Sequence, residues 1–242
     1  MKYILITIAA VVLVGCGESQ QSVPAPEAKP VKPVAEAAKS EPTIAKAPDI
    51  SIHRAVTEGN IEAIKQHLAA GTDINTKVKG GTRGGTPLHW AILNNNKKII
   101  ELLITNGADV NAKANANNKK TPLDWAISHN SQPEIVELLI SKGADVNAKD
   151  DYGATPLDWS DGEIADLLRK HGGKHGTIRG AARGGDIEAV KEFLAAGADV
   201  NAINIIGLTP LDSIRRLPYK DIADLLRKHG GKTSEELKAE GK

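Results

Sequence analysis

The sequence predicts an all-α repeat solenoid, a fold in which short helix pairs are stacked in a row. Two repeated motifs and their spacing lead to this prediction. The tripeptide Thr-Pro-Leu occurs at residues 86–88, 121–123, 155–157 and 209–211. The pentapeptide Gly-Ala-Asp-Val-Asn occurs at residues 107–111, 143–147 and 197–201. The first three Thr-Pro-Leu copies lie 35 and then 34 residues apart, and a constant period of this length indicates stacked supersecondary units.

Each Thr-Pro-Leu motif marks the start of the first helix of a pair. The Thr hydroxyl can cap the helix, and Pro occupies the first helical position, where its missing N–H has no cost. Three residues after the Thr stands His89 in the first copy and Asp in the others, at positions 124, 158 and 212. A carboxylate at that position suits a capping box and the positive end of the helix. Leu88, Ala91 and Ile92 then follow helical spacing.

A second helix follows in each unit. Ile99, Ile100, Leu102 and Leu103 form an apolar stripe at helical spacing. The Gly of the pentapeptide supplies the left-handed residue that ends the helix, and Ala-Asp-Val-Asn opens an extended turn toward the next Thr-Pro-Leu. With only 3% aromatic residues, the core must be built from Leu, Ile, Val and Ala.

These motifs closely resemble the ankyrin repeat over about residues 50–232. The resemblance implies β-hairpin fingers, each followed by an antiparallel helix pair, stacked into a curved solenoid. Six units are expected, because the first and fifth units lack Thr-Pro but keep the family spacing. Repeats one to four then occupy residues 50–176 and repeats five and six occupy residues 177–232. Residues 233–242 are expected to form a C-terminal polar tail.

The junction between the fourth and fifth units is short. Leu157 and Ile178 are 21 residues apart, whereas Leu123 and Leu157 are 34 apart. About four residues are missing between the helices of the fourth unit and about eight where the next finger should be, so no hairpin is expected at residues 171–176. One continuous stack with a lost finger and two lobes joined by a hinge are both compatible with this spacing. We expect the continuous stack, because two repeats alone are too few for a stable solenoid.

The N-terminal segment predicts export and lipid anchoring. Residues 1–15 have a positive start and an apolar run too short to span a membrane, as in a signal peptide. The run ends in Leu-Val-Gly-Cys, which resembles the lipobox of bacterial lipoproteins and implies lipidation of Cys16, the single cysteine. Gly17 favours the outer membrane, facing the periplasm. Residues 16–49, with their many Pro and mixed charges, are expected to form a disordered tether.

Composition and motifs argue against several functions. The balance of 31 Lys and Arg against 30 Asp and Glu gives no reason to expect nucleic acid as a partner. The seven His are scattered, no catalytic constellation is found, and no metal site or cofactor is expected. The prediction is a monomer that is not an enzyme, that contacts the membrane only through its lipid, and that binds another protein.

The resemblance implies that the partner-binding surface is formed by the fingers and the ends of the first helices. The positions carried over are Arg83, Leu93, Asn94, Asn118, Lys120, Ser128, His129, Asp151, Tyr152, Ile206 and Leu208. Among these positions, Tyr152, Ile206 and Leu208 are the best candidates, because exposed large apolar groups on rigid turns often dominate binding. The basic residues of the first two fingers are either simply solvated or face an acidic partner or anionic lipid headgroups.

Trp90, Trp125 and Trp159 occupy the same position in three adjacent units and are expected to form a ladder. One interpretation is packing between helices. The other is an aromatic track for sugar rings or for the apolar side chains of a partner, which makes binding of cell-wall carbohydrate the alternative function. Burial of the indole rings would decide against the track.

Overall fold

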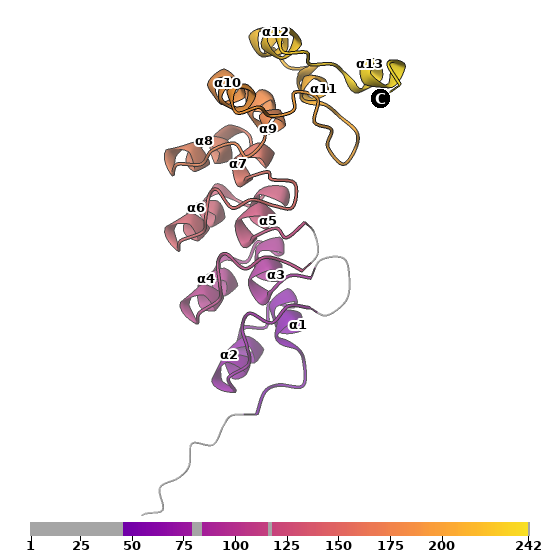
Figure 1. Cartoon of the computed structure of the whole chain (residues 1–242). Helices are drawn as coiled ribbons and strands as arrows, with labels where there is room; N and C mark the ends of the chain where they lie inside the picture. The colour runs from indigo at the N-terminus through magenta and orange to yellow at the C-terminus, as the bar shows by residue number, and fades with distance from the viewer. Residues whose placement is uncertain (1–45, 79–83, 116–117, 242) are drawn as a thin grey trace, which may run out of the picture. The chain divides into compact units, whose positions relative to one another are not determined.

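The computed structural model describes residues 46–78, 84–115 and 118–241, which belong to one compact unit. Two layers of short helices run side by side along this unit (Figure 1). The first layer consists of α1 (Ile52–Thr57), α3 (Pro87–Leu93), α5 (Pro122–Ser128), α7 (Pro156–Trp159), α9 (Ile178–Arg183) and α11 (Pro210–Ile214). The second consists of α2 (Ile61–Ala69), α4 (Lys97–Thr105), α6 (Pro133–Ser141), α8 (Gly162–Lys170), α10 (Ile187–Ala195) and α12 (Lys220–Lys228). Each first-layer helix contacts the next along the row, so the stack is built from neighbours.

The first-layer helices begin at the predicted caps. The α5 helix shows the arrangement: the Thr121 N–H and hydroxyl both donate to Asp124 Oδ2 at 2.8 Å, and the Asp124 N–H donates to Thr121 Oγ1 at 3.3 Å. The same capping box forms at the start of α3, α7 and α11. In these four repeats the local sequence therefore determines where the first-layer helix begins, as the motif predicts.

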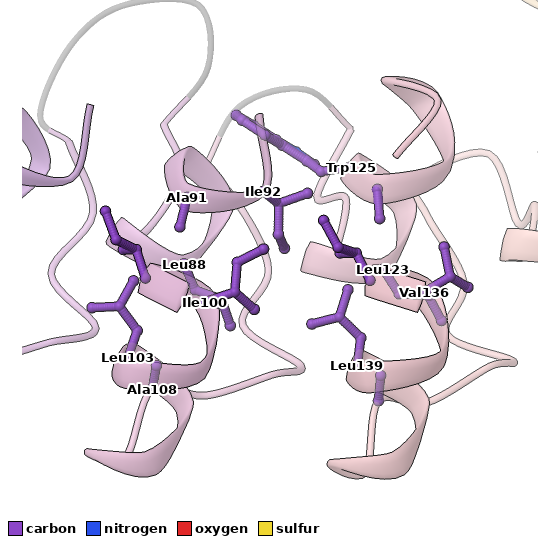
Figure 2. Packing of buried hydrophobic residues seen from close by; sticks show 14 of the residues in the cluster. Leu88, Ala91, Ile92, Ile100, Leu103, Ala108, Leu123, Trp125, Val136 and Leu139 are labelled. Carbon is purple, nitrogen blue, oxygen red and sulfur yellow. The ribbon is translucent and has the colours of Figure 1, made fainter. Parts of the chain in front are cut away.

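Equivalent apolar positions form the core between the layers. Leu88 on α3 and Leu123 on α5 are fully buried, as are Leu103 on α4 and Leu139 on α6. Figure 2 shows these side chains pointing into the same inter-helix layer in two successive repeats. Burying a Leu side chain contributes about 2 kcal/mol to stability. In a stack of this kind, stability comes from the packing of the two helices within a repeat and from the contact of each repeat with its neighbours.

The expected β-hairpins do not form within the described parts of the fingers, since none of the described residues lies in a strand. The turns that precede α3, α5, α7 and α11 are closed instead by backbone hydrogen bonds. In two of them Asp150 N–H donates to Ala154 O at 2.9 Å and Asn204 N–H donates to Leu208 O at 3.0 Å. We refer to the turns that precede α3, α5, α7 and α11 as finger turns.

Asparagine side chains tie successive repeats together beside the finger turns. Asn111 Nδ2 donates to Gly143 O at 2.9 Å, and its Oδ1 accepts from the Asp145 N–H at 2.8 Å. Asn75, Asn147 and Asn201 make the same pair of bonds to the following unit. The last residue of the Gly-Ala-Asp-Val-Asn motif thus has a structural role that its repetition alone does not reveal.

The junction between α8 and α9 has no finger turn, as the short spacing predicts. The hydrophobic core is interrupted here, with one cluster ending at Leu168 and another beginning at Ile178. A buried polar contact fills the interruption: Asp158 Oδ1 lies 2.8 Å from His175 Nδ1, and both side chains are at most 1% exposed. Gly180 is needed beside it, because a Cβ at this position would overlap the Asp158 carboxylate.

Helix α7 packs directly on α9 across this junction. The backbone N–H of Gly176 and the Thr177 hydroxyl also donate to Asp158, so the two parts of the stack share hydrogen bonds as well as surface. This contact supports one continuous stack over two hinged lobes.

The C-terminal residues expected to form a polar tail include a further helix, α13 (Ser234–Ala239). Its cap follows the capping-box pattern of Thr233 and Glu236. The Ser234 N–H donates to Asp212 Oδ2 at 2.8 Å, and Arg227 Nη1 lies 2.6 Å from Glu236 Oε2. Polar contacts therefore attach α13 to the last helix pair.

Candidate functional site

The expected binding residues fall into three groups in the structure. Cys16 and Arg83 lie outside the described residues. Leu93 is half-buried at the end of α3, and Asn94 uses its side chain to donate to Thr57 O at 3.1 Å in the preceding repeat. Ser128 and His129 lie at the end of α5. The remaining positions lie on the finger turns: Asn118, Lys120, Asp151, Tyr152, Ile206 and Leu208.

The Trp ladder is not an exposed track, because its central member is buried. Trp125 is 0% exposed and sits edge-on to His89 and Trp90, with ring centroids 4.9 and 6.2 Å away. His129, expected on the binding surface, packs against the same indole and hydrogen-bonds Trp125 O through Nδ1. Sugar rings therefore cannot stack on three successive indoles, and the packing interpretation holds for Trp125.

Trp159 has different surroundings from Trp125. It is half-buried, and two cations lie over its ring: Lys120 Nζ is 5.0 Å and Arg179 Cζ 5.5 Å from the ring centroid. Lys120 Nζ also donates to Ser128 Oγ at 2.8 Å. Cation–π contacts of this kind are worth about 0.5–2 kcal/mol, so both cations are held at defined positions beside the indole.

A groove of about 560 Å³ opens next to Trp159. Its walls come from segments far apart in sequence: residues around Lys120 and Tyr152, the start of α9 at Ile178 and Arg179, and the finger turn that carries Ile203 and Ile205. Burial lowers the pKa of Arg179, an effect partly opposed by the nearby Asp158 and reinforced by Arg183. The groove thus combines apolar walls with desolvated positive charge.

The apolar rim of the groove is open to solvent. Ile203, Ile205 and Ile206 are 65%, 67% and 71% exposed, and Tyr152 is 47% exposed. Leu208 is only half-buried rather than exposed, because the end of the turn folds inward and its N–H donates to Asn204 Oδ1 at 2.9 Å. Leu208 is therefore a weaker contact candidate than the sequence suggests.

The rim is held in place by hydrogen bonds. The Tyr152 hydroxyl donates to Asn118 Oδ1 at 3.1 Å, and the Asp151 N–H donates to Asn118 O at the same distance. Asp151 also forms an ion pair with Lys119, at 2.8 Å. These contacts join two adjacent finger turns, so the wall of the groove that carries Asn118 and Tyr152 is fixed by hydrogen bonds and an ion pair.

A second hollow of about 590 Å³ lies among α11, α12 and α13. Four of its six charged lining residues are already paired, with Arg227 Nη1 2.6 Å from Glu236 Oε2 and Arg215 Nη1 3.8 Å from Glu235 Oε2. Hydrogen bonds to Arg227 and Thr233 lower the pKa of Glu236 to about 2. These two ion pairs therefore stabilise the C-terminal cap, and their charged groups offer less to a ligand than the cations beside Trp159.

The repeated His and Asp at the helix starts have structural roles. The Thr86 N–H donates to His89 Nδ1 at 3.1 Å, which leaves Nε2 to donate to Lys120 O at 3.2 Å in the next repeat. Burial lowers the pKa of His89 to about 4, so the ring is neutral at pH 7. Burial raises the pKa of Asp124, whose Oδ1 is buried without a hydrogen-bond partner.

Neither metal binding nor membrane insertion finds support in the part of the chain that the structure describes. No group of three or more His, Cys, Asp and Glu side chains is placed there to hold a metal ion. No helix in the same ranges has the length and apolarity needed to cross a membrane.

Sequence reasoning missed Arg179, Ile203 and Ile205. A signal was present in the Ile-Asn-Ile-Ile run at residues 203–206, because Ile203 and Ile205 stand where the fourth repeat has the charged residues Lys149 and Asp151. The shortened junction was recognised, but the hollow that a lost finger turn leaves between its neighbours was not foreseen.

Two family models match the chain. A model described as ankyrin repeats in three copies matches residues 52–150, and a model of the ankyrin repeat matches residues 152–205. A search among curated proteins finds no match.

Proposed function

Because the chain belongs to the ankyrin-repeat proteins, whose repeats act as scaffolds for protein–protein interaction, we propose that it binds a partner protein through its finger turns and the adjoining ends of its first-layer helices. Ankyrin-repeat proteins are typically scaffolds without enzymatic activity, and the binding surface proposed here requires no catalytic group.

The single observation that carries this proposal is the group of exposed apolar side chains on hydrogen-bonded turns. Tyr152, Ile203, Ile205 and Ile206 are 47% to 71% exposed and lie on two finger turns. Burying an aliphatic side chain of this size contributes about 2 kcal/mol, and turns already closed by hydrogen bonds lose little conformational entropy on docking. Apolar groups held out in this way favour association with another surface.

We further propose that the protein is a lipoprotein of the bacterial outer membrane facing the periplasm. The support is the lipobox-like Leu-Val-Gly-Cys and the Gly that follows Cys16. In this arrangement residues 16–49 act as a tether of up to ~3 Å per residue, which lets the repeats reach partners away from the membrane. Radiolabelled palmitate should be incorporated into the wild type and not into Cys16→Ser; labelling of both would contradict the proposal.

Affinity capture of the full chain from native envelopes after mild crosslinking tests the binding function. Ile206→Asp removes an exposed apolar contact from a finger turn, and Ile61→Asp makes the same change at the 37% exposed start of α2 as a matched control. We expect one recurrent protein with the wild type and with Ile61→Asp, and at least a tenfold lower recovery with Ile206→Asp.

Two results would contradict the binding proposal. Equal recovery from both variants would show that the captured protein does not contact the finger turns. Recovery of cell-wall glycan without a recurrent protein would favour the carbohydrate alternative, although the burial of Trp125 leaves that alternative without its aromatic track.

A further inference from the structure

We propose that the groove beside Trp159 binds an acidic, apolar peptide segment of the partner, with an aliphatic or aromatic side chain against the isoleucines and a carboxylate at Lys120 and Arg179. This inference rests on the proposed protein-binding function and assigns it a site and a ligand chemistry.

The groove exists because one finger turn is missing. The connection between α8 and α9 occupies residues 171–177 and makes no finger turn, whereas finger turns precede both α7 and α11. The groove lies between those two turns: Tyr152 and Ala154 form one side, Ile203 and Ile205 the other, and the start of α9 lines it between them. A segment of a partner can therefore occupy the space that a finger turn takes elsewhere in the stack.

The charges that line the groove have one sign. Lys120 and Arg179 are its two charged lining residues, and no Asp or Glu lines it. Among the described residues neither cation forms an ion pair. Three acids lie near the groove. Asp151 pairs with Lys119, and Asp158 accepts hydrogen bonds from Gly176 and the Thr177 hydroxyl and contacts His175. Asp150 raises the pKa of Arg179 only as a minor effect; its Oδ1 accepts from the backbone N–H groups of Tyr152 and Ala154, and its Oδ2 is buried without a hydrogen-bond partner. A carboxylate from outside would complete the electrostatics of this site.

The remaining lining favours a peptide over a sugar. Lys120 and Arg179 already lie over the Trp159 ring, the face that a sugar would stack on. The Oδ1 atoms of both lining amides are in use, since Asn118 Oδ1 accepts from the Tyr152 hydroxyl and Asn204 Oδ1 accepts from two backbone N–H groups. The isoleucines offer no hydrogen bonds to hydroxyl groups. An apolar side chain beside a carboxylate matches these walls better than a polyhydroxylated ring.

The test uses a library of random dodecapeptides displayed on phage and panned against the full chain. We expect the selected peptides to share a large apolar residue next to Asp or Glu. A synthetic peptide of the selected sequence should bind the wild type, and raising the ionic strength should weaken binding because the charges are partly exposed.

Four variants locate the site. Ile205→Ser and Lys120→Glu each change one wall of the groove and should weaken peptide binding at least tenfold. Panning against Lys120→Glu should also no longer select acidic peptides. Leu217→Ser changes an apolar side chain that is 40% exposed at the distant hollow, and Lys98→Glu reverses an exposed charge on α4; both should leave peptide binding unchanged. Circular dichroism confirms that each variant is folded.

Several outcomes would overturn the inference: no enrichment of peptides, selection of basic peptides, or acidic peptides whose affinity is the same for the wild type, Ile205→Ser and Lys120→Glu. Binding to phosphatidylglycerol vesicles with the same sensitivity to Lys120→Glu, and no peptide selection, would assign the groove to lipid headgroups instead. If the tests of the groove fail while Ile206→Asp still abolishes capture of the partner, the groove is not the peptide-binding site, and the proposed protein-binding function is retained.

Discussion

Replacing His89 tests the arrangement that links the first two Thr-Pro-Leu repeats. The neutral ring accepts from the Thr86 N–H at 3.1 Å and donates to Lys120 O at 3.2 Å, and protonation would disrupt the first of these bonds. Burial lowers the pKa of the ring from 6.5 to about 4. Between these values the unfolded chain binds more protons than the folded one, so stability must fall as the pH is lowered through this window.

The size of this effect follows from the two pKa values. A shift from 6.5 to about 4, at about 1.4 kcal/mol per pH unit, corresponds to a loss of about 3 kcal/mol of unfolding free energy between pH 7 and pH 4. Burial also lowers the pKa of His53, which adds a loss of the same sign. The contribution of His89 to the pH dependence is therefore obtained from the difference in unfolding free energy between the wild type and a variant without this ring.

Urea titrations of the wild type and His89→Gln at a series of pH values measure that difference. His89→Gln should be less stable than the wild type at pH 7, because a flexible amide replaces a ring bonded on both sides, and the gap should narrow by about 3 kcal/mol on lowering the pH to 4. His229→Gln, at an exposed histidine, is the control. A constant gap between the wild type and His89→Gln across the whole pH range would refute the reasoning.

Three further predictions concern a helix cap and the contacts between repeats. Asp124→Asn should raise the free energy of unfolding by about 1 kcal/mol at pH 7, because it removes a buried carboxylate whose pKa is raised by burial. The gain should be smaller below pH 4, where the wild-type carboxyl is protonated. Urea titration at both pH values measures the difference. Gly180→Ala should lower the free energy of unfolding by about 2 kcal/mol or more, because the added Cβ overlaps Asp158. As a control, Arg54→Ala at the equivalent exposed position of the first repeat should lower it by less than about 1 kcal/mol. Equal losses in the two variants would contradict the packing at the junction. Asn111→Ala removes two bonds to the next repeat and should cost about 2 kcal/mol, visible as faster amide exchange in the repeats on both sides.

The sequence is sufficient to predict the parts of the fold that depend on local contacts. The Thr-Pro caps, the second-layer helices and the glycines that end them depend on residues a few positions apart, and the structure has all of them. The β-hairpins were implied by the family rather than by local pattern, and the described finger turns contain no strand.

The environment of each Trp could not be predicted, because it depends on neighbouring repeats. Trp125 lies between His89, Trp90 and His129 and is fully buried. Trp159, at the same repeat position, ends the short α7 beside the missing finger turn and stays half-buried. Periodicity assigns both residues the same position in the repeat and says nothing of what the adjacent units place around them.

The groove could not be predicted from the sequence for a similar reason. Lys120, Tyr152, Arg179 and Ile205 come from four separate segments, and only the lost finger turn brings them around one hollow. The spacing of the junction showed that a turn was missing, but the consequence depends on how α9 packs against α7. Such packing cannot be read from a repeat pattern that the junction itself interrupts.

The most direct test of the central claim is a photocrosslinking map of the full chain in native envelopes. A photoreactive amino acid is placed in turn at Tyr152, Ile203 and Ile206 on the finger turns and at Glu101, Glu137 and Lys191 on exposed faces of α4, α6 and α10. Our account predicts that the first three positions crosslink the same protein and that the second three do not. Crosslinks to that protein from the second-layer helices, with none from the finger turns, would contradict it.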